Sequence, residues 1–301
     1  MPPVAAVLLG MALASGCAGA TAGGPPPAPP PPLSVPLPSP ALSGGGAVSD
    51  VDLLYQAEQI LVRDCMARQG LTYRPTPRTP VPDMERFPYV VDDLEWAQAN
   101  GYGRAARRKA EQSTTAAANY YRGLPPARQR AWLIAFHGER GPGLEAQMPT
   151  GGKVGHSDKG CAAQAWQELY GDMRQWYRVS RVTQTLDSMR VAQTQQNPRY
   201  VAARERWREC MRSEGFSVPA PVALRGRQLA YRGADAEARD RKAATAEAKC
   251  ALSSGLSKAA HELDAANGAA LRRRYRSEFD TAERLRTAAL PRARALVGTP
   301  P

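Results

Sequence analysis

The chain has 301 residues, of which 43% are hydrophobic, 23% charged and 7% aromatic. This composition is close to that of an average soluble protein, so the chain can bury a hydrophobic core in one or two domains. No apolar run reaches the length of about 18 residues that indicates a membrane span, which excludes a polytopic membrane protein. The formal net charge is +12, with arginine far more frequent than lysine, a bias typical of a high-GC genome.

The first 49 residues contain no Asp, Glu, Lys or Arg. Val4 to Ala14 form an apolar segment of signal-peptide length, followed by Ser15, Gly16 and Cys17. Small residues before a cysteine resemble the lipobox of bacterial lipoproteins, in which the signal is cut before the cysteine and the thiol carries a diacylglycerol. The resemblance implies a signal peptide over residues 1–16 and a lipid anchor on Cys17. Ordinary secretion, with cleavage after Ala20, is the alternative.

Residues 17–49 form a linker rich in proline and glycine. Proline cannot continue a helix or a strand ladder, so we expect a disordered, polyproline-II-prone spacer with flexible glycine ends. At about 3.1 Å per residue, residues 25–40 alone could extend on the order of 50 Å. Such a spacer would hold a folded domain away from a membrane. A peptide ligand for an SH3-like domain is the alternative, but no basic residue flanks the run.

Helical periodicity dominates the remaining sequence, and strand alternation is nowhere convincing. We therefore expect an all-α protein made of two helical units, residues 50–196 and residues 197–301. The expected segments in chain order are a helix over 51–69, a proline-rich stretch over 74–91, a short helix from Asp92 or Asp93 to Gly101, a helix from Pro125, a glycine-rich loop over 138–160, one long helix over 161–195, a helix from Asn197 to Gly215, a loop over 217–233, and helical sequence over 235–290 with possible breaks at Gly255 and Gly268.

An internal repeat links residues 63–73 to residues 208–218. Arg, Cys, Met and Gly recur at identical spacing, with an acid before the cysteine and an apolar residue after the glycine. Each copy predicts a helix that ends at a glycine with positive φ, with the cysteine about one turn earlier. Apart from Cys17, the chain has four cysteines: Cys65, Cys161, Cys210 and Cys250.

Four cysteines outside the cytoplasm indicate two disulfides, which can pair in three ways. The repeat favours Cys65–Cys161 and Cys210–Cys250, with one bridge in each unit. Free buried thiols are the alternative, and they would require a cytosolic chain. A structural zinc site would need a pair of closely spaced cysteines, and the sequence has none. Redox-active cysteines commonly occur as a closely spaced Cys-X-X-Cys pair, which the sequence also lacks, so we expect the disulfides to be structural.

Three motifs resemble secreted or lipid-anchored proteins of actinobacteria to which no activity is assigned. They are CMxxxG with its following apolar residue, Gly101-Tyr102-Gly103, and the GCxxxAxxxLYG pattern of residues 160–171. The resemblance covers about residues 52–265. It implies an extracytoplasmic location and disulfides, and it provides no activity and no site residues to carry over.

The sequence contains few candidates for catalytic residues. Asp92, Asp93 and Asp158 could serve an envelope hydrolase, although nothing in the sequence selects a pair of acids. The run His156-Ser157-Asp158 has the residue types of a catalytic triad, but neighbours in sequence cannot adopt triad geometry unaided. His137 ends an apolar helix, where a cation is favoured by the helix dipole. We therefore expect no catalytic residue, no metal and no cofactor.

Positive charge gathers in the second unit, which carries 21 basic and 12 acidic residues after residue 198. The densest patch could contact anionic lipid or another polyanion of the cell wall. The alternative is a solvated face that is rich in arginine only because of codon bias. An extracytoplasmic location argues against nucleic acid as the ligand. The patch consists of Arg272, Arg273, Arg274 and Arg276.

The sequence thus favours a non-enzymatic binding or scaffolding module, lipid-anchored at the outer face of the cytoplasmic membrane, with a protein partner that it does not identify. A secreted form, an envelope hydrolase and a redox sensor are the alternatives.

Overall fold

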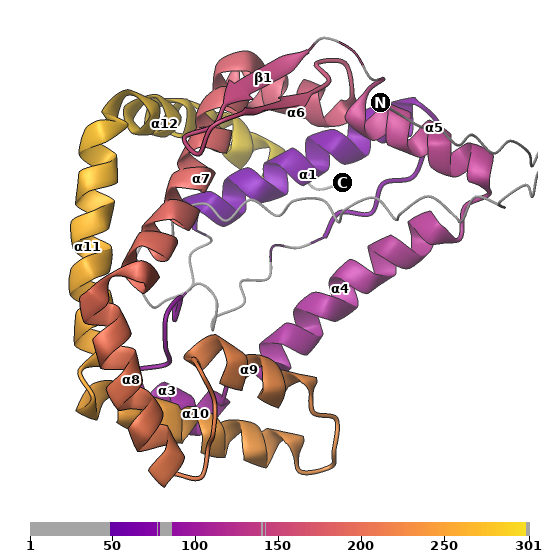
Figure 1. Ribbon diagram of the computed structural model, residues 1–301. Coiled ribbons are helices and arrows are strands. Elements are labelled where there is room, and N and C mark those ends of the chain that lie inside the picture. Colours follow the sequence, from indigo (N-terminus) through magenta and orange to yellow (C-terminus); the bar gives the residue numbers. More distant parts are fainter. Residues whose placement is uncertain (1–48, 77, 79–85, 140, 142, 299–301) are drawn as a thin grey trace, which may run out of the picture. The chain divides into compact units, whose positions relative to one another are not determined.

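A computed structural model (Figure 1) describes residues 49–76, 78, 86–139, 141 and 143–298. In these residues the chain is all-α apart from one short hairpin, as predicted. The predicted signal peptide, Cys17 and nearly all of the spacer lie outside the described residues. The elements are α1 (Asp50–Arg68), α3 (Leu94–Asn100), α4 (Arg104–Arg122), α5 (Pro126–His137), β1 (Leu144–Gln147), β2 (Lys153–His156), α6 (Cys161–Tyr170), α7 (Met173–Gln196), α8 (Pro198–Ser213), α9 (Pro221–Ala230), α10 (Ala236–Ser253), α11 (Leu256–Arg274) and α12 (Arg276–Gly298).

Side-chain caps set the starts of α3 and α8. Asp93 accepts a hydrogen bond from the backbone N–H of Trp96 at 2.8 Å, and Asn197 accepts one from that of Arg199 at 2.9 Å. Such caps satisfy N–H groups that the first helical turn leaves without a partner. Pro198 then takes the first helical position, where its missing N–H is not needed. Both helices begin where the sequence predicts.

The two copies of the internal repeat end their helices in the same way. Gly70 and Gly215 have φ of 68° and 86°. After each glycine the chain folds back: the Leu71 N–H donates to the Met66 carbonyl at 3.0 Å, and the equivalent bond of the second copy measures 2.8 Å. Glycine adopts this left-handed conformation without the steric cost of a Cβ. The predicted helix ends are confirmed.

Both predicted disulfides are present. Cys65 is bonded to Cys161 and Cys210 to Cys250, each with a Cα–Cα distance of 5.6 Å, which is ordinary for a disulfide. Disulfides persist in oxidising surroundings and are rare in the cytosol. The two bridges therefore indicate an extracytoplasmic compartment.

The first disulfide belongs to a hydrophobic core that we call the Cys65–Cys161 cluster, built mainly from α1, α6, α12 and the first turns of α7. Helix α1 packs against both α6 and α12. Leu61 of α1, Leu169 of α6 and Leu285 of α12 are buried in this cluster. The C-terminal helix therefore completes the core that the first helix begins.

The second disulfide belongs to the Cys210–Cys250 cluster, in which α8, α10 and α11 surround residues 87–102. Helix α10 contacts α3, α8, α9 and α11. Trp207 of α8 and Tyr102, just before α4, are fully buried. A segment from the N-terminal half of the chain thus fills the core of the second cluster.

Each cluster therefore includes residues from both sides of the expected boundary at residue 196. Helix α4 links the two through its ends. At its start, Arg104 contacts the end of α9, and at its end Tyr121 meets Trp132 edge to face with ring centroids 5.3 Å apart. Arg74 lies over the ring of Tyr120, 4.9 Å from its centroid.

The expected glycine-rich loop over 138–160 is corrected by the structure, because it contains the antiparallel hairpin of β1 and β2. Leu144 and Ala146 of β1 are buried and pack with Ala163 and Tyr177 from two helices. Strands of four residues are too short for their alternation to be recognised in the sequence. Their stability comes from these tertiary contacts.

Three helix boundaries also differ from the expectation. The predicted helix over 161–195 is two helices, because Gly171 takes φ of 81° and Asp172 caps a new start. The predicted loop over 217–233 contains α9. Gly268 lies within α11, and the break comes at Tyr275 instead. Gly255, with φ of 75°, does separate α10 from α11, as predicted.

Candidate functional site

The arginines predicted to contact polyanions lie where α11 ends and α12 begins, and all are exposed. Positive charge in the last turn of a helix is favoured by the helix dipole. Two of the guanidinium groups lie over the neighbouring rings of Phe279 and Tyr275, 4.6 and 5.4 Å from their centroids. Local helix chemistry thus explains part of this patch, which consists of Arg272, Arg273, Arg274 and Arg276.

The acids considered for a hydrolase each have a separate structural role. Asp92 accepts hydrogen bonds from Ser257 Oγ at 2.6 Å and His261 Nε2 at 2.7 Å, which attaches the segment before α3 to α11. Asp93 caps α3, and Asp158 forms an ion pair with an arginine of α7. Each of the three carboxylates is thus already engaged in a structural contact.

His137 and His156 lie together, with His137 Nδ1 3.4 Å from His156 Nε2. His156 Nδ1 donates to the backbone carbonyl of Ser157 at 2.7 Å, so the run His156-Ser157-Asp158 does not form a triad. Partial desolvation lowers the pKa of both imidazoles, and the nearby second imidazole lowers that of His137 further. These effects favour the neutral imidazole, whereas the helix dipole at the end of α5 favours the cation.

Across the part of the chain that the structure describes, no three His, Cys, Asp or Glu side chains gather closely enough to hold a metal ion. No helix in that part combines the length and the apolar character needed to cross a membrane. The strongest remaining candidates for a ligand site are pockets with charged walls.

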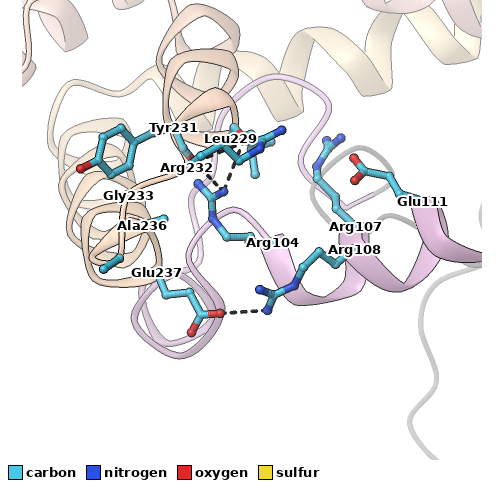
Figure 2. Close-up of a pocket in the computed structure, with 11 residues that line it drawn as sticks. Arg104, Arg107, Arg108, Glu111, Leu229, Tyr231, Arg232, Gly233, Ala236 and Glu237 are labelled. Carbon is cyan, nitrogen blue, oxygen red and sulfur yellow. Dashed lines mark hydrogen bonds and ion pairs between the residues drawn. The ribbon is translucent and has the colours of Figure 1, made fainter.

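One such pocket, of about 340 Å³, lies between the start of α4 and the turn from α9 to α10 (Figure 2). Its walls carry more positive than negative charge. The basic residues come from two segments far apart in the sequence, and Figure 2 shows them on the facing sides of the pocket. We call this the arginine pocket; its charged residues are Arg104, Arg107, Arg108, Arg232, Glu111 and Glu237.

Arg104 holds the two walls together. Its guanidinium donates to the backbone carbonyls of Gln228, Leu229 and Tyr231, where α9 ends. The same guanidinium lies 3.6 Å from the carboxylate of Asp240 on α10. Only 12% of the Arg104 side chain is exposed. Arg104 is thus a structural residue that positions the other groups of the pocket.

The rim of the pocket carries the accessible charge. Arg108 forms an ion pair with Glu237 at 2.9 Å, and both side chains are more than half exposed. An exposed pair of this kind contributes little to stability and can exchange one partner for a ligand. Arg232 is also exposed and donates to carbonyls at the end of α9. Arg107 lies on the α4 wall beside Arg108 (Figure 2).

The start of α4 is electrostatically unusual. Gly103 precedes the helix with φ of 74° and has no side chain with which to cap it, and the first turn contains no acid. Helix N-termini carry partial positive charge, so anions are favoured there and cations are not. Here Arg104, Arg107 and Arg108 add positive charge instead. Such a helix start is a favourable position for a bound anion.

Two acids of α10 are buried beneath its surface. Asp240 is 1% exposed and accepts a hydrogen bond from the N–H of Tyr102 at 2.9 Å. Glu247 is fully buried and accepts bonds from the N–H of Val91 at 2.8 Å and the hydroxyl of Tyr102 at 2.6 Å. Desolvation raises the pKa of Glu247 to about 7. Both acids face inward and bind the segment that leads into α4.

The inward-facing acids change the charge of the outer surface. As a sequence, α10 has three acids and four bases and is nearly neutral. In the fold, only Glu237 of the three acids is exposed, while all four bases are exposed. Those bases are Arg239, Arg241, Lys242 and Lys249.

Sequence reasoning missed the arginine pocket and assigned the basic surface to the C-terminal helices. A signal was present: Arg104, Arg107 and Arg108 follow Gly103 at the spacing of one helical face, with no acid to balance the helix start. Arg232, 128 positions after Arg104, was beyond the reach of any local pattern.

Comparisons with protein-family models, with curated proteins and with solved structures found no match. The resemblance to secreted actinobacterial proteins therefore stays a prediction.

Proposed function

We propose that this protein is a non-enzymatic binding module of the cell envelope that holds anionic groups, such as phosphate, in the arginine pocket. The observation that carries the proposal is the gathering of four arginines around one pocket at an uncapped helix start. Guanidinium groups match phosphate and carboxylate oxygens with paired hydrogen bonds. The two disulfides support an extracytoplasmic site of action.

In this proposal, a lipid on Cys17 attaches the module to the outer face of the cytoplasmic membrane, and residues 18–49 form the tether. The intact mass of the protein from its native membrane fraction tests the anchor. We expect a mass that begins at a diacylated Cys17, with four thiols that appear only after reduction. A mass that includes Met1 and free thiols would contradict both the anchor and the compartment.

Binding of inorganic phosphate and tripolyphosphate to the Arg107→Ala/Arg108→Ala variant tests the pocket. Each lost charge-assisted hydrogen bond costs about 1.5–3 kcal/mol, so we expect affinity to fall at least about tenfold by calorimetry. Stability should stay within about 1 kcal/mol of wild type, because the change removes cations from a helix start and one exposed ion pair.

The matched control is Arg128→Ala/Arg130→Ala, which removes two exposed arginines from α5, away from the pocket. We expect this control to bind as the wild type does at equal ionic strength. Equal losses in both double variants would mean that net charge alone attracts the anion, and the pocket would then have no specific role.

A second candidate is contact of the α11–α12 arginines with anionic lipid, favoured by their exposure. It predicts salt-sensitive retention on phosphatidylglycerol vesicles that is lost when Arg272, Arg273, Arg274 and Arg276 are changed to alanine. Retention that does not change with salt concentration, or that persists after the four substitutions, would refute this contact.

A further inference from the structure

A second pocket, of about 360 Å³, lies farther along α10, where α10 meets α3 and the chain after α8. Arg241, Lys242 and Lys249 line it together with one acid, Glu214. The three basic side chains are exposed, and none forms an ion pair with another described residue. This pocket therefore also presents net positive charge, which we call the lysine pocket.

Helix α10 connects the two pockets. Glu237 in its first turn lines the arginine pocket, and Arg241, one turn later, lines the lysine pocket. From Glu237 to Lys249 the helix rises about 18 Å, at 1.5 Å per residue. The acids between these positions, Asp240 and Glu247, are buried. The exposed side of α10 between the pockets is therefore not interrupted by negative charge.

We propose that one linear polyanion occupies both pockets at once and runs along α10 between them. The ligand class is a flexible chain with phosphate groups repeated along its backbone, of the kind found in anionic cell-wall polymers. This inference rests on the proposed function, since the arginine pocket must bind a single anionic group before a chain can gain from the second pocket. The gain arises because the second contact is intramolecular once the first has formed.

The aromatic residues at the pockets favour a phosphate chain over a nucleic acid. Proteins that bind single-stranded nucleic acid stack bases on exposed aromatic rings. At the arginine pocket, the ring of Tyr231 is covered by the guanidinium of Arg239, 4.4 Å from its centroid, and its hydroxyl donates to Asp235. At the lysine pocket, Phe216 is partly buried against the Cys210–Cys250 cluster.

The test compares tripolyphosphate, which is too short to reach from the arginine pocket to Lys249, about 18 Å along α10, with a long linear polyphosphate, and expresses affinity per phosphate group. The protein is the full chain with both disulfides formed. We expect the long chain to bind at least about 100-fold more tightly per phosphate than tripolyphosphate. Lys242→Ala/Lys249→Ala should remove most of this gain and leave tripolyphosphate binding unchanged.

Salt dependence gives a second readout. Each phosphate contact contributes about 0.7 to the slope of log affinity against log salt for a single-stranded chain, so the double lysine variant should reduce the slope by about 1.4. The control Arg128→Ala/Arg130→Ala removes the same charge elsewhere and should leave both the gain and the slope near those of wild type.

The outcomes separate the two proposals. Binding of tripolyphosphate without any gain from chain length would overturn the continuous site and leave the proposed function intact. A chain-length gain that persists in the double lysine variant would also overturn it. Failure of both ligands to bind would overturn the proposed function itself. Tighter binding of a thymidine oligonucleotide than of polyphosphate with equal charge would replace the phosphate chain by a nucleic acid.

Discussion

The Cys65–Cys161 cluster and the Cys210–Cys250 cluster each contain a disulfide and a carboxyl group bonded to a tyrosine. Glu58 accepts a hydrogen bond from the Tyr170 hydroxyl at 2.6 Å in the first cluster, and Glu247 accepts one from the Tyr102 hydroxyl at 2.6 Å in the second. Desolvation raises the pKa of both carboxyls to about 7. The two acids differ in exposure, because Glu247 is fully buried and Glu58 only partly buried.

The clusters differ in the helix that faces each core. Helix α12 meets the first core with alanine and leucine, the buried residues being Ala282, Leu285, Ala289 and Ala293. Helix α10 meets the second core with alanine as well but also buries Asp240 and Glu247. Two acids removed from the surface leave the outer side of α10 basic. An almost neutral helix can thus present a cationic surface through burial of its acids alone.

Removal of a disulfide should cause the largest loss in the free energy of unfolding. The bridges close 96 and 40 residues, so loop entropy predicts a loss of about 5 kcal/mol for Cys65→Ala/Cys161→Ala and about 4 kcal/mol for Cys210→Ala/Cys250→Ala. Urea unfolding measures both. A larger loss for the shorter loop would show that native-state contacts, and not loop length, set the relative stability of the clusters.

The next largest effect concerns the packing of α12, from the C-terminal half of the chain, in the Cys65–Cys161 cluster. Leu285→Ala should cost about 2–5 kcal/mol, because it leaves a cavity in the Cys65–Cys161 cluster. Hydrogen exchange should show lost protection in α1 and α6, which contact α12. The matched variant Leu256→Ala should act on the Cys210–Cys250 cluster instead, since Leu256 is fully buried there. Loss of protection throughout the chain in both variants would show that the clusters unfold as one unit.

Glu58 and Glu247 predict a pH dependence of stability that is smaller than the effects of these substitutions. Because folding raises their pKa from 4.5 to about 7, the unfolded chain loses protons first as pH increases. The free energy of unfolding should therefore fall between about pH 4.5 and pH 7, by on the order of 3 kcal/mol for each carboxyl, and level off above that range.

Glu247→Gln and Glu58→Gln test this dependence, since the amide keeps a hydrogen-bonding group and does not ionise. Chemical unfolding across the range should show a flatter profile in each variant, and the flattest in the double variant. A wild-type profile that does not change across this range would contradict the raised pKa values.

The histidine pair predicts the smallest effect, with the opposite sign. Folding lowers the pKa of His137 and His156 below 6.5, so the unfolded chain takes up protons first as pH decreases. Stability from this pair should be lost as pH falls below 6.5, and His156→Gln should remove that part of the dependence. Hydrogen exchange in α5 and the hairpin would report it. Equal protection of α5 at pH 5 and pH 7 would oppose this interpretation.

The parts of the fold that depend on residues close together in the sequence could be predicted. The ends at Gly70 and Gly215 follow from a glycine that accepts positive φ, and the starts at Asp93 and Asn197 follow from caps within one turn. The disulfide pairing followed from the repeat, because two copies of one helix end place their cysteines alike.

The missed elements share a different cause. The hairpin over 144–156 is held by its contacts with Ala163 and Tyr177, and no local pattern records those contacts. Arg272, Arg273, Arg274 and Arg276 are recognisable in the sequence because they are close together along the chain. Arg232 is distant in sequence from the start of α4, and only the tertiary structure brings the two together.

The amino-acid sequence by itself determined the all-α class, the helix ends and the two bridges, because each depends on backbone conformation or spacing within a few residues. Only the tertiary structure decided which charges face water. Asp240 and Glu247 alternate with bases along α10, and their burial against the segment before α4 gives that helix a basic outer side. Burial is a property of packing between distant segments, so the arginine pocket became visible only in the folded chain.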